Sequence, residues 1–94
     1  MAQFLVHHKV EDYKMWKTVF DSHFSLRSEA GSLGGKIFRS TNDTNELFVL
    51  LEWDSLENAQ KFAQSDSIKE AMKKAGVVGI PVVYFVDEVA ETAK

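Results

Sequence analysis

The sequence has no cysteine, a single proline and no long run of apolar or basic residues. Without cysteine the chain cannot form a disulfide, a thiolate metal site or a thiol nucleophile, so its fold needs no oxidising compartment. No stretch approaches the ~20 apolar residues of a membrane-spanning helix, and the first ten residues lack the order of a signal peptide. We therefore expect a cytoplasmic protein that makes no contact with a membrane.

The charge of the chain argues against nucleic acid as a partner. Its 14 acidic and 11 basic residues give a formal net charge of −3 and are spread along the sequence. No basic block is present that could neutralise a run of phosphates. A length of 94 residues and a hydrophobic share of 45% predict one globular domain over residues 1–94, with a thin core that association would strengthen.

Segments rich in β-branched and aromatic residues predict four strands. They cover residues 4–10, 34–40, 46–53 and 82–86. Residues 41–45, Thr-Asn-Asp-Thr-Asn, join the middle two strands as a hairpin, because such side chains hydrogen-bond their own backbone in turns. Pro81 is predicted to open the last strand, where the missing N–H of proline is tolerated.

Apolar residues spaced by three and four positions predict two helical regions between these strands. The first ends at Gly31, and aromatic residues form its buried stripe: Tyr13, Trp16, Phe20 and Phe24. The second begins at Asp54 or Ser55, breaks at residues 65–67, and resumes over residues 68–75. The element order is β-α-β-β-α-β.

This order predicts an α+β, ferredoxin-like fold, in which a four-stranded antiparallel sheet carries both helical regions on one face. The other face would be polar if it were exposed to water. However, Phe48 and Leu50 alternate with apolar neighbours along the third strand. We expect a second copy of the sheet to cover this face, which makes a homodimer in the form of a dimeric α/β barrel. The alternative is a scattering of exposed apolar residues, which is common on soluble proteins.

Three segments carry a resemblance to a known family: residues 8–16 with Tyr13 and Trp16, residues 52–59 at the close of the third strand, and Phe62. In these segments the chain resembles the dimeric α/β-barrel superfamily that includes the antibiotic-biosynthesis-monooxygenase-like proteins. The resemblance covers nearly all of the chain. It implies ferredoxin-like homodimers whose sheets pack face to face. The activities it implies include cofactor-free oxygenation of aromatic polyketides, quinol oxidation, haem degradation and ring rearrangement, but it does not decide among them.

His8 and Glu52 are the candidate catalytic residues. His7 and His8 are neighbours on a strand and point to opposite faces, and the resemblance favours His8 as the residue that meets a substrate. An unperturbed histidine has a pKa near ~6.5 and can act as a general base at neutral pH. Glu52 carries a charge in an otherwise apolar strand, where a charge must be paired or hydrated, so this residue either has such a partner or marks the pocket.

We expect the pocket on the sheet face away from the helices, where it would bind a small apolar or aromatic molecule. The candidate substrate-binding residues lie mainly on strands, and His23 lies on the first helix: Phe38, Phe48, Leu50, Trp53, Tyr84, Phe85 and His23. The alternative for each aromatic residue is a place in the core, because each strand side chain points either to the helix-covered face or to the opposite face of the sheet.

No metal or other cofactor is expected. The three histidines lie on separate elements or on opposite faces, and the carboxylates show no metal-ligand spacing. The resemblance implies that haem degradation needs a histidine on the second helix, and residues 54–75 contain none. The glycines form no phosphate loop, and the third strand lacks the motif of an RNA-recognition domain.

Two functional hypotheses remain from the sequence. In the first, the chain is a small-molecule-binding dimeric barrel that works as a cofactor-independent monooxygenase, or a related enzyme, on an aromatic or quinone-like compound. In the second, it is a non-catalytic ligand-binding or assembly module whose apolar sheet face only dimerises. A cavity that contains His8 favours the first hypothesis, and a filled interface favours the second.

Overall fold

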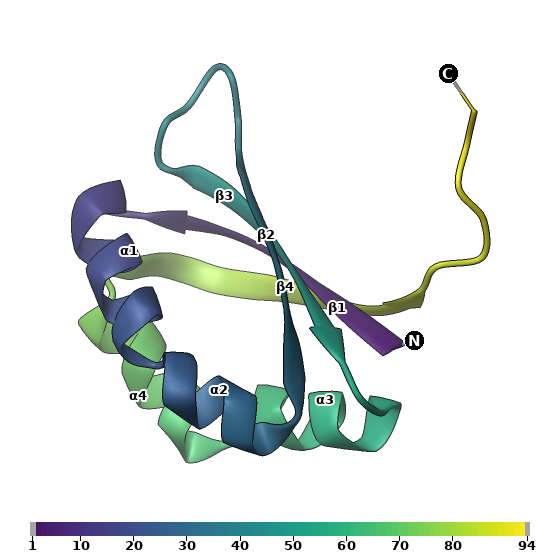
Figure 1. The fold of residues 1–94 in the computed structure, drawn as a ribbon. Helices are drawn as coiled ribbons and strands as arrows, with labels where there is room; N and C mark the ends of the chain where they lie inside the picture. The colour runs from purple at the N-terminus through teal and green to yellow at the C-terminus, as the bar shows by residue number, and fades with distance from the viewer. Residues whose placement is uncertain (1, 94) are drawn as a thin grey trace.

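The computed structural model describes residues 2–93. In these residues a four-stranded antiparallel sheet carries all the helices on one face (Figure 1). The elements are β1 (Ala2–Val10), α1 (Tyr13–Ser22), α2 (Phe24–Ala30), β2 (Ser32–Arg39), β3 (Glu46–Trp53), α3 (Leu56–Ala63), α4 (Asp66–Lys74) and β4 (Val77–Asp87). The strand order across the sheet is β2-β3-β1-β4, so β1 and β3 are central and β2 and β4 are edges. The predicted ferredoxin-like architecture is confirmed.

The first helical region is two helices, α1 and α2, that meet at His23. Asp12 caps the start of α1 by accepting a hydrogen bond from the backbone N–H of Lys14, and Gly31 closes α2 in the left-handed conformation with a φ of 112°. The break changes which residues face the sheet. Phe24, predicted in the buried stripe, is 67% exposed, and Arg27 is buried in its place.

The second helical region has the predicted break. Ser55 caps α3, and Ser65 caps α4 by accepting a hydrogen bond from the N–H of Ile68. Because Ser65 supplies this cap, α4 begins at Asp66, two residues before the predicted restart. The helices bury small and aromatic residues against the sheet, among them Ala59, Phe62 and Ala71.

β4 is much longer than predicted, and the prediction that Pro81 opens it is wrong. The strand begins at Val77 and contains Pro81 in its interior. Proline is tolerated there because β4 is an edge strand whose outer N–H groups have no ladder to join. The pairing with β1 is also irregular. His7 pairs with Val82 and Lys9 pairs with Val78, so five residues of β4 lie opposite three residues of β1. This bulge lies opposite His8.

The two faces of the sheet differ in what covers them. On the helix-covered face every side chain of β3 is buried, from Leu47 to Trp53, and on β1 so are Phe4, Val6, His8 and Val10. On the other face, which we call the open face, nothing in residues 2–93 covers the strands, and apolar side chains such as Tyr84 and Phe38 are about half exposed. No helix in this described part of the chain has the length and apolar character needed to cross a membrane.

Candidate functional site

His8 lies on the helix-covered face of the sheet and is 6% exposed. Alternation along β1 puts it on the same face as Phe4, Val6 and Val10, which are all buried. Its ring packs near Trp16 of α1, with 5.7 Å between the ring centroids. The strand pattern thus fixes the direction of the histidine, and the helix supplies its cover.

Neither ring nitrogen of His8 has a hydrogen-bond partner among the described protein atoms. Burial in apolar surroundings, together with a smaller effect of the positive charge that His7 can carry, lowers the pKa of His8 from 6.5 to about 4. At neutral pH the ring is therefore uncharged, with one N–H donor and one acceptor lone pair. A buried polar group left without partners costs about 1–3 kcal/mol of stability, and native proteins keep few of them.

His8 faces an apolar cavity of about 80 Å³ between the sheet and the helices. The sheet contributes residues from β1, β3 and β4: Phe4, Val6, His8, Val49, Leu51 and Val83. The helices contribute Trp16, Val19, Phe20, His23, Leu26, Arg27, Phe62, Ala63, Ser67, Ile68, Ala71, Met72 and Ala75. Small side chains on α3 and α4, such as Ala63 and Ala71, leave this space where larger ones would fill it.

In this structure the cavity is too small for a ring-shaped ligand. Its volume of about 80 Å³ is below the ~150 Å³ of a protein cavity that holds benzene. Leu26 and Ser67 are exposed at the surface and also line the cavity, so it reaches the surface where α2 and α4 lie. The flexible side chain of Met72 is part of the same lining and can move to admit a larger molecule.

His23 also lines the cavity, at the junction of α1 and α2. Its Nδ1 lies 2.8 Å from the carbonyl oxygen of Val19. Because a carbonyl only accepts hydrogen bonds, Nδ1 carries the proton, and in the neutral ring the other nitrogen is an acceptor. Two histidines from separate elements, His8 and His23, are thus brought to one cavity.

This cavity lies on the side of the sheet opposite to the one on which we expected a pocket. The reason is that the helices meet the sheet through a few large side chains and several alanines, which leaves space inside the protomer. Of the predicted site residues, only His8 and His23 line this cavity. Phe48, Leu50 and Phe38 lie on the open face, and Tyr84 joins them because it pairs with Leu5 of β1.

Trp53 and Phe85 lie on the helix-covered face without lining the cavity. Trp53 is fully buried and packs against Phe4 and Phe62, with centroid distances of 5.4 and 5.0 Å. Phe85 pairs directly with Phe4 and is 40% exposed at the edge of the sheet. Both aromatic residues therefore belong to the packing around α3 and the sheet edge.

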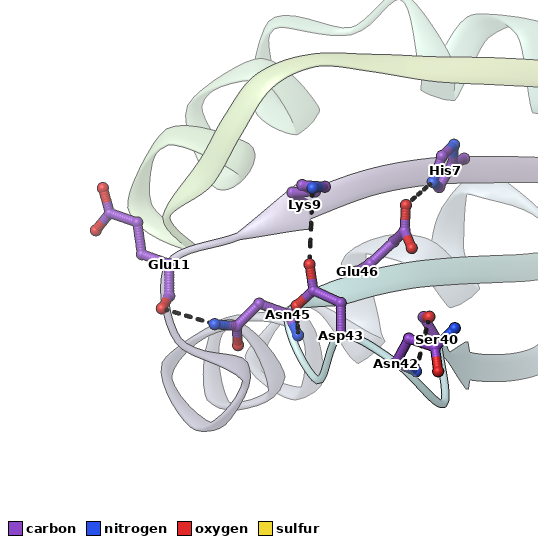
Figure 2. Close-up of polar contacts among 8 residues, drawn as sticks. All are labelled: His7, Lys9, Glu11, Ser40, Asn42, Asp43, Asn45 and Glu46. Carbon is purple, nitrogen blue, oxygen red and sulfur yellow. Dashed lines mark hydrogen bonds and ion pairs between the residues drawn. The ribbon is translucent and has the colours of Figure 1, made fainter.

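Glu52 and His7 lie on the open face, each with a partner. Gln3 donates a hydrogen bond to Glu52 with 3.3 Å between Nε2 and Oε1. His7 contacts Glu46 with 3.0 Å between Nε2 and Oε2, as Figure 2 shows. Since Glu52 and His8 are on opposite faces, they cannot act on one ligand within a single protomer.

Arg27 also lines the cavity, whereas its place in the sequence favours a solvated surface charge over a residue that binds a carboxylate or phenolate. It is 9% exposed, and its Nη1 donates to the carbonyl oxygen of Phe20 over 2.6 Å. Its guanidinium also lies over the ring of Phe20, 3.7 Å from the centroid. The spacing of Trp16, Phe20, His23 and Arg27 by four, three and four residues could have found it, because that spacing continues one helical face across the break.

In residues 2–93 no group of three or more His, Cys, Asp or Glu side chains is arranged to hold a metal ion. The two cavity histidines together with Arg27 form a set of nitrogen groups within apolar walls. Such a set can donate and accept hydrogen bonds, take up a proton and bind a negatively charged oxygen.

The fold is ferredoxin-like, and the comparisons with known proteins name its family. The family model for antibiotic biosynthesis monooxygenase matches residues 15–74. The chain belongs to this family. No match was found among curated proteins.

Solved structures share the fold at low sequence identity. A protein of Bordetella bronchiseptica proposed to be an antibiotic biosynthesis monooxygenase is 19% identical, with a TM-score of 0.78 over 95% of this chain and 97% of that one. A similar protein of Caulobacter crescentus is 21% identical, with a TM-score of 0.71 over 95% and 90%. A variant of SnoaB, a cofactor-independent oxygenase from Streptomyces nogalater, is 9% identical, with a TM-score of 0.75 over 99% and 97%.

Proposed function

We propose that the chain is a cofactor-independent monooxygenase that acts on an aromatic or quinone-like compound in the cavity between sheet and helices. The observation that carries the proposal is His8, a neutral, buried imidazole with no partner at either nitrogen, in a cavity whose other walls are mainly apolar. Membership of the family and the likeness to an oxygenase that needs no cofactor support the same reaction class.

In the proposed mechanism His8 takes a proton from the substrate. Its pKa of about 4 makes it a weak base on its own, because burial disfavours the imidazolium. The substrate must therefore be acidic, such as a phenol or an enol, so that its anion stabilises the imidazolium beside it. The apolar walls keep water away from the anion and leave it electron-rich.

The substrate anion then reduces O₂, so the reaction needs no other reductant. An electron pair from the anionic carbon goes to O₂, a carbon–oxygen bond forms, and the imidazolium returns its proton to give a hydroperoxide. Loss of water from this intermediate converts a CH₂ group into a carbonyl. One oxygen atom enters the product and the other leaves as water, so the methylene carbon is oxidised and O₂ is reduced.

The test is oxygen uptake with anthrone-type and quinol substrates, by the natural chain and by two matched variants. His8→Leu replaces the imidazole by an apolar side chain of similar size. This variant should lower the rate at least about a hundredfold, the usual contribution of a general base. His7→Gln alters the neighbouring histidine on the other face and should stay within about twofold. If oxygen uptake by the natural chain were equal to that of buffer, the proposal would be wrong.

The pH profile gives a second reading of the same mechanism. Since the base must be deprotonated to act, the rate should fall on the acid side as the pH approaches about 4, the pKa of His8, and not near 6.5. A fall centred near 6.5 would point to an unburied histidine.

We further propose that the protein is a cytoplasmic homodimer joined through the open face. Apolar side chains of β1, β3 and β4 alternate onto this face, and several are substantially exposed, including Val82 at 42% and Tyr84 at 55%. Covering them removes apolar surface from water. Sedimentation equilibrium should give twice the mass of the chain, and a monomer at micromolar concentration would contradict this proposal.

A non-catalytic ligand-binding module is the second candidate, and the small volume of the cavity favours it. At about 80 Å³ the cavity suits a molecule smaller than the aromatic substrates proposed above. In that case small phenols should bind, with loss of binding in His8→Leu, while oxygen uptake stays at the level of buffer.

A further inference from the structure

A second hollow, which we call the β2 groove, lies between α2 and the edge strand β2. Its volume is about 340 Å³, within the ~300–1,000 Å³ typical of small-molecule sites. Phe20, Arg27 and Leu51 line both the groove and the cavity, so they form the wall between the two. The rest of the groove comes from Phe24 and Ser28 and from residues 32–37.

Arg27 is held in this wall without being neutralised. Its side chain makes one hydrogen bond in the described part of the chain, from Nη1 to the carbonyl of Phe20, although a guanidinium has five N–H donors. Among residues 2–93 it forms no ion pair with a carboxylate. Burial lowers the pKa of Arg27, and the charge of Asp21 raises it. Asp21 nevertheless forms its ion pair with Lys17, at a distance of 2.7 Å, and not with Arg27.

The groove is cationic and has apolar walls. Lys36 lies along the groove, but it pairs with Leu50, so its side chain alternates onto the open face and Arg27 supplies the charge. No acidic residue is among the described lining. Phe24 and Leu33, at 67% and 54% exposed, offer apolar surface beside this cation. This combination fits a ligand with one negative group and an apolar body.

The backbone of β2 is irregular at the groove. Its pairing with β3 shifts register between Ser32 and Gly34, which leaves Leu33 unpaired in a bulge. Gly34 has a φ of 107°, in the left-handed region that favours glycine. A side chain at Gly34 would meet no atom within 4 Å, so the strand is open on this side.

We propose that the β2 groove binds an organic anion, a carboxylate or phenolate on an apolar body about the size of one substituted aromatic ring. The anion contacts Arg27, and the body lies against Phe24 and Leu33. Charge complementarity selects this occupant. The rival occupant is the acidic segment 88–93 of a second copy, which contains Glu88 and Glu91. The site is separate from the reaction proposed for His8.

The experiment is a ¹⁵N NMR titration of the full chain with 4-phenylbutyrate and with its neutral counterpart 4-phenylbutan-1-ol. The acid should shift the amide signals of Gly34 and Gly35 in the groove, and the alcohol should bind about tenfold more weakly, since it lacks the charge-assisted hydrogen bonds. Equal affinity for the two compounds would overturn the proposal. So would shifts that cluster around His8, since these would report the cavity.

Three variants separate the site from general charge effects. Arg27→Met should weaken the acid about tenfold. Lys36→Gln, whose side chain alternates onto the open face, should weaken it by less than about twofold. Arg39→Gln removes another cation of the same strand, one that lies over Tyr13, and should change nothing. If Arg27→Met does not fold, the comparison of the acid with the alcohol on the natural chain still decides. A loss of about tenfold in Lys36→Gln or in Arg39→Gln would contradict the proposal.

The rival occupant has its own signature. If a chain with Glu88→Gln and Glu91→Gln shifts the signals of Gly34 and Gly35 before any ligand is added, the groove holds the C-terminal segment of a second copy, and the proposal is overturned. Unchanged signals in that chain, together with binding of the acid, support the small anion. Oxygen uptake is not a readout here, so failure of this proposal leaves the proposed reaction untouched.

Discussion

His7 and His8 are adjacent in the chain, and the two faces of the sheet give them opposite surroundings. On the open face, His7 contacts Glu46 at 3.0 Å and stacks on Phe48 with 4.4 Å between ring centroids. On the helix-covered face, His8 is buried with neither nitrogen paired. On the open face His7 and Glu52 have protein partners, whereas on the helix-covered face His8 and Nε1 of Trp53 have none among the described residues, and His8 is the one that lines the cavity.

This difference assigns candidate chemistry to one face of the sheet and association to the other. The helix-covered face holds the core and the cavity, so it combines stability with candidate chemistry. The open face holds partnered polar groups and exposed apolar ones, a composition suited to association. Each prediction below tests whether the two faces act independently.

The largest expected effect comes from two leucines of β3 that point to opposite faces. Leu47 is fully buried under the helices, and Leu47→Ala should lower the free energy of unfolding by about 3 kcal/mol at every protein concentration. Leu50 lies on the open face, so Leu50→Ala should lower stability mainly through the dimer and hence in a concentration-dependent way. Urea unfolding at several protein concentrations measures both. A concentration-independent loss in Leu50→Ala as large as that in Leu47→Ala would remove the distinction between the faces.

The next effect is the pH dependence of stability that His8 produces. Its folded pKa of about 4 lies below its unfolded value of 6.5, so the unfolded chain binds more protons between these values. Stability from this group is therefore complete above pH 6.5 and decreases by up to about 3 kcal/mol as the pH falls to 4. Urea unfolding between pH 7 and 4 should show this slope in the natural chain, and His8→Leu should remove that part of it. An unchanged slope in His8→Leu would assign the loss to other groups.

The sequence predicted the direction of His8 relative to its neighbours, because strand alternation is a local property. Phe4, Val6 and Val10 share its face in the sequence pattern and in the structure. The ferredoxin-like order and the hairpin at residues 41–45 followed equally from local signals. Local patterns also predicted the helix break at residues 65–67, although not the cap by Ser65 that starts α4 at Asp66.

The features that depend on packing could not be predicted in the same way. No glycine or proline marks the break at His23, which nevertheless exposes Phe24 and buries Arg27. The cavity arises from the fit of alanines on α3 and α4 against the sheet, which no single segment encodes. Pro81 is tolerated inside β4 only because that strand is an edge, which is a property of the whole sheet.

A smaller effect is expected for the stability of His8→Leu at pH 7. Replacing a buried imidazole that has no partners by a leucine removes unsatisfied polar atoms and keeps the volume, so the variant should be more stable by about 1 kcal/mol. Thermal unfolding and urea unfolding measure this gain, which should accompany the loss of oxygen uptake. A less stable variant would mean that His8 serves the structure, since its removal would then break favourable contacts.

The smallest effect belongs to His7→Gln. The contact with Glu46 joins side chains that are 38% and 26% exposed, and solvent and salt screen an ion pair of this kind. Glutamine can still donate a hydrogen bond to Glu46, so the free energy of unfolding should change by less than about 0.5 kcal/mol, and the oxygen uptake should stay at the natural level. Urea unfolding and the uptake assay measure the two quantities. If His7→Gln reduced uptake as strongly as His8→Leu, the chemistry would reach across the sheet, and the assignment of the site to one face would be wrong.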